Sequence, residues 1–473
     1  MNIKQVFQAL DELFQSIHQL GGKPYLVGGC VRDTLLQEKG WSVSFKDIDI
    51  EVHRLELDLL IQVLGKYTSR IDEVGKSFGV IKVMLPQFHD QFPSMEALDF
   101  TLPRTETKSG AGYTGFDISV NPYLGLKEAA SRRDYTINSM YMDIEGIRDP
   151  YEGRADLDLR LLRAVSPKFS EDPLRVLRGM RQASQFNLDV VPETAQLCRE
   201  LKEEYRFLAQ ERIWGEWWKW ASKTPFPSKG LKFLQEAGWI SFYPELEALI
   251  GTPQDPIWHP EGDVMTHTAL VCDAAARIAL RDGLASFERG VLVMAALCHD
   301  LAKPFCTEIQ PDGRITSRGH EKAGEEPSVS LLSRMGYPKL KKGYGPVLEG
   351  LVPLVVNHLA HCSLGAEPTA KAVRKLSTKV NIEMLARLVE ADHSGRPPLE
   401  PHLPEGMETI LVMSKDLGVS QGEPDPLITG KILIHSGVQP GKEMGQLLKK
   451  AYEGQLEGHF DTVEAGLSWL GVI

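Results

Sequence analysis

Two aspartates separated by one residue, Asp47 and Asp49, lie in an apolar run and could hold divalent cations. Because strand side chains alternate, a spacing of two predicts that both carboxylates project from the same face. The glycine pair Gly28 and Gly29, followed by Arg32, precedes them. Glycines let a backbone approach a phosphate closely, and a helix N-terminus offers free N–H groups to an anion. This combination is typical of a phosphoryl-transfer site that uses two metal ions.

A strand, a glycine turn, a helix and a second strand are predicted over residues 25–52 and would position these groups. Singly, a Gly-Gly turn or an Asp-x-Asp strand end is more often structural, but their combination favours catalysis. The segments LVGGCVRD and DIDIEV resemble the head of the class II tRNA nucleotidyltransferases. These are the CCA-adding enzymes and their poly(A) polymerase relatives, which belong to the polymerase-β-like nucleotidyltransferases. The resemblance implies that Asp47 and Asp49 bind two Mg²⁺ ions.

The composition is that of a water-soluble protein with several domains. The chain has 473 residues, too many for one ordinary core, and 42% are hydrophobic and 25% charged. Its six cysteines form no Cys-x-x-Cys pair, which indicates a reducing compartment without disulfides or a thiolate zinc site. The first residues are amphipathic, and no run of about 18 apolar residues occurs. We therefore expect a cytoplasmic protein with no membrane segment.

The net charge of −11 argues against a nonspecific nucleic-acid coat, because phosphate binding relies on Lys and Arg. Basic residues nevertheless concentrate in four short stretches, at 132–133, 154–163, 175–181 and 339–342. A long acidic protein can carry a local basic groove. The charge pattern is therefore compatible with a nucleic-acid partner.

After a helix at residues 55–67, a hairpin is predicted at 74–85, followed by a strand at 97–102 that carries Asp99. Asp99 is a candidate third metal-site acid if the strands are neighbours, and the alternative is an aspartate that holds a turn. Residues 104–116 lack an apolar period, which predicts a mobile loop. This segment is similar to the flexible loop of the CCA-adding enzymes, and a plain surface connection is the alternative.

The segment RRDYTIN supplies an arginine fork, Arg132 and Arg133, ahead of a predicted helix. Two arginines can hold a triphosphate bidentately, and a neighbouring aspartate can fix their orientation. The segment resembles the family's RRDxTINA motif, with Ser139 in place of the alanine, and capping of the helix is the alternative. The resemblance implies nucleotide binding by a set of turn and helix residues: Gly28, Gly29, Arg32, Arg132, Arg133, Asp134 and Asn138.

A helix predicted over residues 171–181, EDPLRVLRGMR, carries Asp172, Arg175, Arg178 and Arg181 at three-residue steps. Such a stripe is usually a solvated face, but flanking apolar residues allow it to line a groove. The resemblance implies a protein template, in which the Asp and Arg of an EDxxR motif bond the Watson–Crick edges of CTP or ATP. UTP and GTP present the wrong polarity to that pair. The Glu-Arg motif at 211–212 would brace this helix.

A proline-rich break at residues 225–227 precedes helices with scattered histidines. Imidazoles beside a His-Asp pair suit a divalent metal ion, such as a transition metal, whereas a lone buried histidine would be a core residue. The segments LCHDLAKP and VVNHLAH resemble an HD-domain phosphohydrolase, with Ala302 in place of the glycine of HDxGK. The candidate ligands are spread along the chain: His267, His299, Asp300, His320, His358 and Asp392.

The predicted fold class is α+β, with a polymerase-β-like head at 1–150, a helical neck at 151–225, an HD body at 226–395 and a helical tail at 396–473. The predicted reaction is addition of CMP and AMP from CTP and ATP to the tRNA 3′ end. The alternatives are a poly(A) polymerase, a CC- or A-adding enzyme, or an HD-type RNA phosphodiesterase or phosphatase with an RNA-binding head. The sequence leaves the oligomeric state open.

Overall fold

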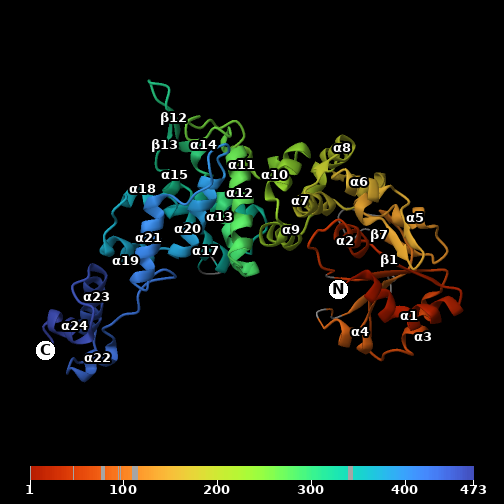
Figure 1. Cartoon of the computed structure of the whole chain (residues 1–473), viewed down its shortest axis with the longest axis horizontal. Helices are drawn as coiled ribbons and strands as arrows, with labels where there is room; N and C mark the ends of the chain where they lie inside the picture. The colour runs from red at the N-terminus through yellow and green to blue at the C-terminus, as the bar shows by residue number, and fades with distance from the viewer. Residues whose placement is uncertain are drawn as a thin grey trace. The chain divides into compact units, whose positions relative to one another are not determined.

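The computed structural model describes residues 2–45, 47–75, 80–93, 95, 97–108, 116–338, 343 and 345–473. It divides into two compact units, which are shown in Figure 1 and described separately below. The first comprises Met1–Ile213 and Lys232–Trp239, and the second Trp214–Leu231 and Ile240–Ile473. The predicted head and most of the predicted neck fall in the first unit.

The first unit is built around a seven-stranded sheet with strand order β3-β4-β5-β2-β1-β8-β9. The strands are β1 (Lys23–Val27), β2 (Asp49–His53), β3 (Ile71–Gly75), β4 (Val80–Val83), β5 (Leu98–Thr101), β8 (Tyr141–Asp143) and β9 (Gly146–Arg148). Strand β1 pairs antiparallel with β2, and β2 pairs parallel with β5. A hairpin is present as predicted, in the antiparallel pair β3 and β4, but β3 begins three residues before the predicted segment at 74–85. The central strands β1 and β2 are largely buried, although β2 carries the polar residues Asp49, Glu51 and His53.

Helices accompany this sheet: α1 (Ile3–Gln19), α2 (Gly29–Glu38), α3 (Leu57–Leu64), α4 (Pro86–Gln91) and α5 (Leu126–Ala130). Helix α1 is amphipathic and buries Leu10, Leu13 and Ile17. Its first turn is closed by a capping box between Asn2 and Gln5, which satisfies N–H groups that would otherwise lack partners. The predicted helix after the arginine fork is wrong in extent, because only a three-residue 3-10 turn, Thr136–Asn138, precedes β8.

The predicted loop at residues 104–116 is wrong at both ends. Residues Arg104–Lys108 form β6, which pairs antiparallel with β7 (Phe116–Val120) in a separate two-stranded sheet. The β-branched Thr105 and Thr107 favour a strand, a preference that the absence of an apolar period concealed. The remainder of the predicted loop, 109–115, lies outside the described residues.

The neck helices of the first unit include α6 (Gly153–Asp158), α7 (Leu174–Phe186) and α8 (Pro192–Glu200). Helix α7 begins three residues later than predicted, because Pro173 occupies its N-cap and Asp172 is extended. The side chain of Asp172 accepts a hydrogen bond from the Leu174 N–H at 3.0 Å. Asp172 therefore caps the helix and does not lie on its face.

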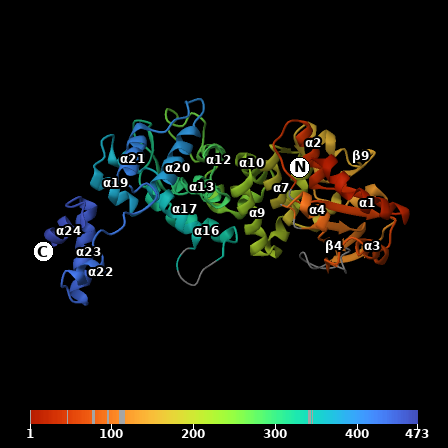
Figure 2. The same ribbon diagram turned by 60° about the horizontal axis from the view of Figure 1, so that its bottom comes forward.

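Helices α9 (Gln210–Lys223) and α10 (Pro227–Glu236) contribute residues to both units. The second unit is centred on α12 (Val264–Arg281), α13 (Ser286–Cys298), α17 (Pro346–Asn357) and α20 (Ile382–Ser394). Figures 1 and 2 both show α12, α13 and α20 side by side. Helix α13 is buried along most of its length, as its nearly continuous apolar run predicts.

Shorter elements surround these helices: α11 (Pro244–Glu247), α14 (Lys303–Cys306), α15 (His320–Ala323), α16 (Glu325–Arg334), α18 (Ala360–Leu364), α19 (Ala370–Ser377), α21 (Glu405–Asp416) and the hairpin of β12 (Thr307–Ile309) and β13 (Ile315–Ser317). The chain ends in α22 (Gly430–His435), α23 (Lys442–Glu457) and α24 (Val463–Leu470). These last helices share a small core that includes Leu433, Met444 and Phe460.

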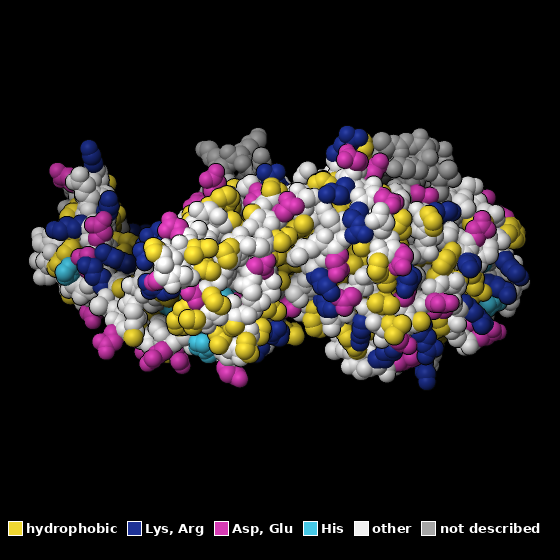
Figure 3. All heavy atoms as spheres, turned by 90° about the horizontal axis from the view of Figure 1, so that it is seen from above, with side chains coloured by type: hydrophobic (Ala, Val, Ile, Leu, Met, Phe, Trp, Pro, Cys, Tyr) yellow, Lys and Arg dark blue, Asp and Glu magenta, His cyan; other side chains and the backbone are white. Residues whose placement is uncertain are grey.

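All six cysteines are free, as predicted. Among the described residues, the helices are all too short or too polar to cross a membrane. On the face drawn in Figure 3, basic side chains are interspersed with acidic ones.

Candidate functional site

The predicted carboxylates of the head gather at one end of β2. Asp49 is the first residue of β2 and lies opposite Val27 on β1 and Asp99 on β5. Asp47 precedes the strand and is exposed. The prediction that strand alternation places both carboxylates on one face therefore does not apply to Asp47. Burial raises the pKa of the Asp49 carboxyl, Arg133 lowers it, and Asp99 and Asp47 raise it further. A bound cation would reduce this repulsion between neighbouring carboxylates.

The glycine turn lies against this group. Gly28 has φ 74° and ψ −127°, a conformation open to glycine alone. A Cβ at Gly28 would lie 3.2 Å from Nη1 of Arg133 and 3.6 Å from Oδ2 of Asp49. Gly29 begins α2, and Arg32 in its first turn donates from Nη1 to Oδ1 of Asn138. Glycine therefore permits a close approach of the turn, the carboxylate and an arginine.

A buried carboxylate that the sequence analysis missed, Glu51, holds the arginine fork. Its Oε2 accepts hydrogen bonds from Nη2 of Arg132 at 3.3 Å and Nη2 of Arg133 at 3.4 Å. Its Oε1 lies 3.0 Å from Nε2 of His53 and accepts from the Tyr141 hydroxyl at 3.1 Å. Burial opposes ionisation of Glu51, but His53 and the two arginines lower its pKa to about 2. The sequence signal was the continued spacing of two in DIDIEV.

Asp134 connects the fork to the neck. Its Oδ1 accepts from Nδ2 of Asn138 at 3.0 Å, and its Oδ2 accepts from Arg178 at 2.7 and 2.9 Å and from Gln182 at 3.2 Å. Burial opposes ionisation, yet Arg178 and the hydrogen bonds hold the pKa of Asp134 well below its usual range. The aspartate thus joins Asn138 in the head to two residues of α7.

We expect Asp134→Asn to lower the free energy of unfolding by about 2–3 kcal/mol, because it weakens charged hydrogen bonds and leaves buried groups imperfectly paired. The lowered pKa of Asp134 means that its stabilisation is present at neutral pH and is lost as pH falls towards the folded-state value. Denaturant unfolding across acidic and neutral pH measures both effects. Asp158→Asn, at a surface ion pair with Lys39, is the control. Equal stability of Asp134→Asn and wild type would contradict this role.

The predicted template residues are engaged with the protein itself. Oδ2 of Asp172 lies 3.3 Å from Nη2 of Arg212, in keeping with the predicted bracing. Arg175 is buried and donates from Nη1 to the carbonyl of Lys168 at 2.7 Å and from Nη2 to that of Arg132 at 2.6 Å. Arg181 donates to Gln185. The four residues therefore do not form one charged stripe: Asp172 precedes α7, and each arginine has its own partner.

In the second unit the structure brings all six predicted metal ligands together, and all are buried. They come from α12, α15, α20 and the ends of α13 and α17. Nε2 of His267 lies 3.1 Å from Oδ1 of Asp392 and 3.4 Å from Nε2 of His299. Nε2 of His320 lies 3.1 Å from Oδ1 of Asp300 and 3.2 Å from Nε2 of His358.

These residues form two triads, and within each triad the three ligand atoms lie within 4.8 Å of one another. One is His267, His299 and Asp392, and the other is Asp300, His320 and His358. Oδ2 of Asp300 also lies 3.1 Å from Nε2 of His299, so Asp300 faces both triads. Burial lowers the pKa of His358 to about 3, which keeps its imidazole neutral. Imidazole nitrogens together with buried carboxylate oxygens are ligands that fit a divalent transition metal ion.

A cavity of about 380 Å³ opens beside the two triads and is lined by Asp300, His320, His358 and Asp392 among others. Two basic side chains that the sequence analysis missed, Lys303 and Arg396, also line this cavity. Nζ of Lys303 lies 2.7 Å from Oδ2 of Asp300, and Nη2 of Arg396 lies 2.5 Å from Oδ1 of Asp392. The short spacings of HDLAK and DHSGR were the available signals.

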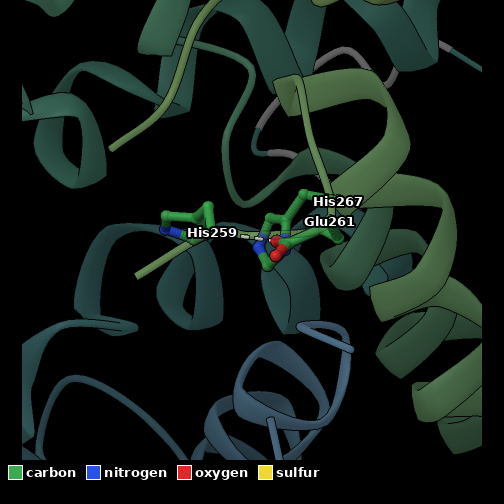
Figure 4. Close-up of side chains that lie close together, drawn as sticks. All are labelled: His259, Glu261 and His267. Atoms are coloured by element: carbon green, nitrogen blue, oxygen red, sulfur yellow. Dashed lines mark hydrogen bonds and ion pairs between the residues drawn. The ribbon is translucent and has the colours of Figure 1, made fainter. Parts of the chain in front are cut away.

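Glu261 was also missed. Its Oε1 lies 2.7 Å from Nδ1 of His267 and 2.9 Å from Nδ1 of His259, and Figure 4 shows its carboxylate beside the His267 ring. The segment HPEGD, ahead of α12, lies in a turn with no periodic pattern, and an acid six residues before a histidine is not a recognisable spacing. This contact therefore depends on the fold.

Comparisons with known proteins agree on both units. Residues 24–163 match the poly A polymerase head domain, and residues 264–407 match the HD domain. The multifunctional CCA protein of Pasteurella multocida is 36% identical over 369 residues, which are 76% of this chain and 79% of that protein. That of Vibrio parahaemolyticus is 35% identical over 411 residues, 84% of this chain and 91% of that protein.

Solved structures show the same fold. The Bacillus stearothermophilus CCA-adding enzyme in complex with CTP has a TM-score of 0.61 at 21% identity, covering 98% of this chain and 96% of that one. The Thermotoga maritima CCA-adding enzyme complexed with tRNA has a TM-score of 0.58 at 18% identity, covering 99% and 95%. These likenesses confirm the predicted α+β class with a polymerase-β-like head and a helical remainder.

Proposed function

Because the chain belongs to the multifunctional CCA protein family and is a CCA-adding tRNA nucleotidyltransferase, we propose that Asp47, Asp49 and Asp99 form its catalytic centre. The observation that carries this proposal is the parallel pairing that places Asp49 beside Asp99, against the turn at Gly28. The acceptor would be the tRNA 3′ end, and the donors CTP and ATP. Because these substrates are supplied in the cytoplasm, we expect the protein to act there.

The head is that of a family that uses divalent metal, and for this chain we propose Mg²⁺, which prefers carboxylate oxygens. The residues fit such an ion. Burial and the negative charges of Asp99 and Asp47 raise the pKa of Asp49, and a cation bound between the carboxylates would offset this repulsion. When bound, the metal stabilises charge on the transferring phosphoryl group and acidifies the attacking hydroxyl. The role of the protein is to hold three carboxylates on adjoining backbone segments.

The triphosphate would be bound by Gly28 and Gly29 of the turn together with the basic residues Arg32, Arg132 and Arg133. Nε of Arg133 is buried and has no hydrogen-bond partner among the described residues, which is a place for an anionic oxygen. Oε2 of Glu51 accepts from the Nη2 groups of both arginines and so orients the fork.

Base selection would rest on Asp172 and Arg175, flanked by Arg178 and Arg181. Asp172 supplies an acceptor and Arg175 a donor, which match the amino group and ring acceptor of cytosine or adenine. In the structure both Nη groups of Arg175 donate to backbone carbonyls, so base reading uses its remaining N–H or exchanges one of these bonds. Nη2 of Arg212, 3.3 Å from Oδ2 of Asp172, holds that carboxylate in place.

We expect Arg175→Ala to reduce discrimination of CTP over UTP about ten- to a hundredfold. The correct base loses a hydrogen bond in a partly dry pocket, roughly 1–3 kcal/mol, whereas a mismatched base loses less. The measurement is kcat/KM for all four nucleotides on tRNA that ends before CCA, together with a melting temperature. Gln196→Ala, at an exposed residue of α8, is the control. An unchanged CTP-to-UTP ratio with a lowered melting temperature would reduce Arg175 to a structural role.

For the second unit we propose a metal-dependent phosphohydrolase site formed by His267, His299, Asp300, His320, His358 and Asp392. Two triads linked by the contact of Asp300 with His299 favour two adjacent ions, and the imidazole content favours a transition metal. A metal ion bound there would activate a water for attack on a phosphate ester. Lys303 and Arg396 line the same cavity and can bind the oxygens of a phosphate group.

One assay tests the head reaction against its rivals. Purified protein is given tRNA that lacks CCA, with each labelled nucleotide alone and then with CTP and ATP together. Full CCA addition gives two C residues with CTP alone and a third, A, residue when ATP is also present. A long product with ATP alone would indicate a poly(A) polymerase, and a product that stops after CC would indicate a partial enzyme.

A further inference from the structure

The four histidines of the proposed phosphohydrolase site are each oriented through Nδ1. Nδ1 of His299 lies 2.7 Å from the carbonyl oxygen of Ala296, and that of His358 lies 2.7 Å from the carbonyl of Val355. His320 uses the carbonyl of Ser317 in the same way, at 2.5 Å. Each of these acceptors lies three residues earlier in the chain, so local backbone geometry leaves Nε2 facing the cluster.

His267 differs, because its Nδ1 lies against a side chain. In the part of the chain that the structure describes, it is the one cluster histidine whose Nδ1 meets a carboxylate, Oε1 of Glu261 at 2.7 Å. The side chain of His267 is 0% exposed and that of Glu261 1%. The same oxygen lies 2.9 Å from Nδ1 of His259, so the carboxylate stands between two imidazoles (Figure 4).

The sequence places Glu261 for this contact. Asp263 caps α12 by accepting from the Thr266 N–H at 2.8 Å, which fixes the start of the helix that carries His267. Glu261 lies two residues before that cap, on the turn that leads into the helix. A charged acceptor at Nδ1 makes Nε2 a stronger donor to a cation than a neutral carbonyl does, and it fixes the tautomer.

We propose that Glu261 is a positioning residue that sets the cation affinity of the triad His267, His299 and Asp392. It acts by fixing the His267 ring and by raising the donor strength of its Nε2. The inference rests on the proposed metal-dependent phosphohydrolase function. It assigns to Glu261 a part in binding the ion and none in contacting the substrate.

The test is titration of the full chain with Ni²⁺ by calorimetry, in excess Mg²⁺ so that the carboxylates of the head are filled. Loss of a carboxylate behind a ligating histidine typically weakens metal binding 10- to 100-fold. We expect Glu261→Gln, which keeps the shape and an acceptor oxygen, to raise the Kd for Ni²⁺ about tenfold. Glu261→Ala also loses the orientation and should raise it further, towards a hundredfold.

The control is Glu457→Gln, which removes a carboxylate of α23 that pairs with Lys371 and Lys375 and belongs to neither triad. It should leave the Kd for Ni²⁺ unchanged. A melting temperature for each variant checks that the chain is folded. A wild type that binds Ni²⁺, with unchanged affinity in both Glu261 variants, would overturn the role of Glu261. A wild type that does not bind Ni²⁺ would instead overturn the proposed phosphohydrolase site and the inference with it.

Discussion

Asp49→Asn should lower the addition of CMP and AMP by at least about 10³-fold, equivalent to roughly 4 kcal/mol of transition-state stabilisation, while tRNA binding is retained. The amide keeps the shape of the side chain but is a poor ligand for Mg²⁺. Asp49 begins β2 and lies beside Asp99, so its loss removes the central member of the proposed carboxylate set. Asp47→Asn should have a similar effect. The measurements are single-turnover addition and a tRNA binding isotherm.

The control is Asp143→Asn on β8, where the carboxylate lies 3.5 Å from Arg148 and away from the glycine turn. Its addition rate should stay near wild type. If Asp49→Asn retains more than about a tenth of the activity, the carboxylate assignment is wrong. If tRNA binding is lost in parallel with catalysis, Asp49 supports the fold and does not hold a metal ion.

The second large effect concerns the other unit. Asp300→Asn and His299→Ala should each abolish metal-dependent hydrolysis of a phosphoester such as bis-p-nitrophenyl phosphate, because Asp300 faces both triads. Addition of CMP and AMP should remain close to wild type, because the proposed catalytic residues of the head belong to a different unit. Both rates are measured on the same protein preparation, hydrolysis with added Ni²⁺ or Mn²⁺.

His435→Ala, at an exposed histidine of α22, provides the comparison, and it should leave both rates unchanged. Hydrolysis that persists in Asp300→Asn would place the reaction elsewhere. Absence of both metal binding and hydrolysis in the wild type would return the histidines to a structural role. A loss of nucleotide addition in Asp300→Asn would contradict the separation of the two reactions.

The fold class and the family were predictable because short motifs encode local geometry. LVGGCVRD and DIDIEV specify a strand, a glycine turn and a second strand within one segment, and the position of Asp99 followed from a neighbouring strand. The predicted head and the reaction are confirmed by the family. The roles of the individual residues stay predictions, although the structure gathers the candidate ligands of each proposed site.

What the sequence concealed were contacts between segments. Glu51 follows the spacing of Asp47 and Asp49, but its burial beneath the arginine fork depends on how β2 meets residues far along the chain. Glu261 reaches His267 because a turn folds onto the start of α12. The late start of α7 was readable in principle, since proline is tolerated at the beginning of a helix but not in its interior.

Hydrogen bonds connect α7 directly to the turn that carries the arginine fork. Arg175 donates to the carbonyl of Arg132, and Arg178 donates to the carboxylate of Asp134. The span between the proposed base-reading end and the proposed phosphate-holding end is therefore set by the protein. If both ends bind the nucleotide as proposed, substitutions that loosen either end should change triphosphate affinity and base preference together.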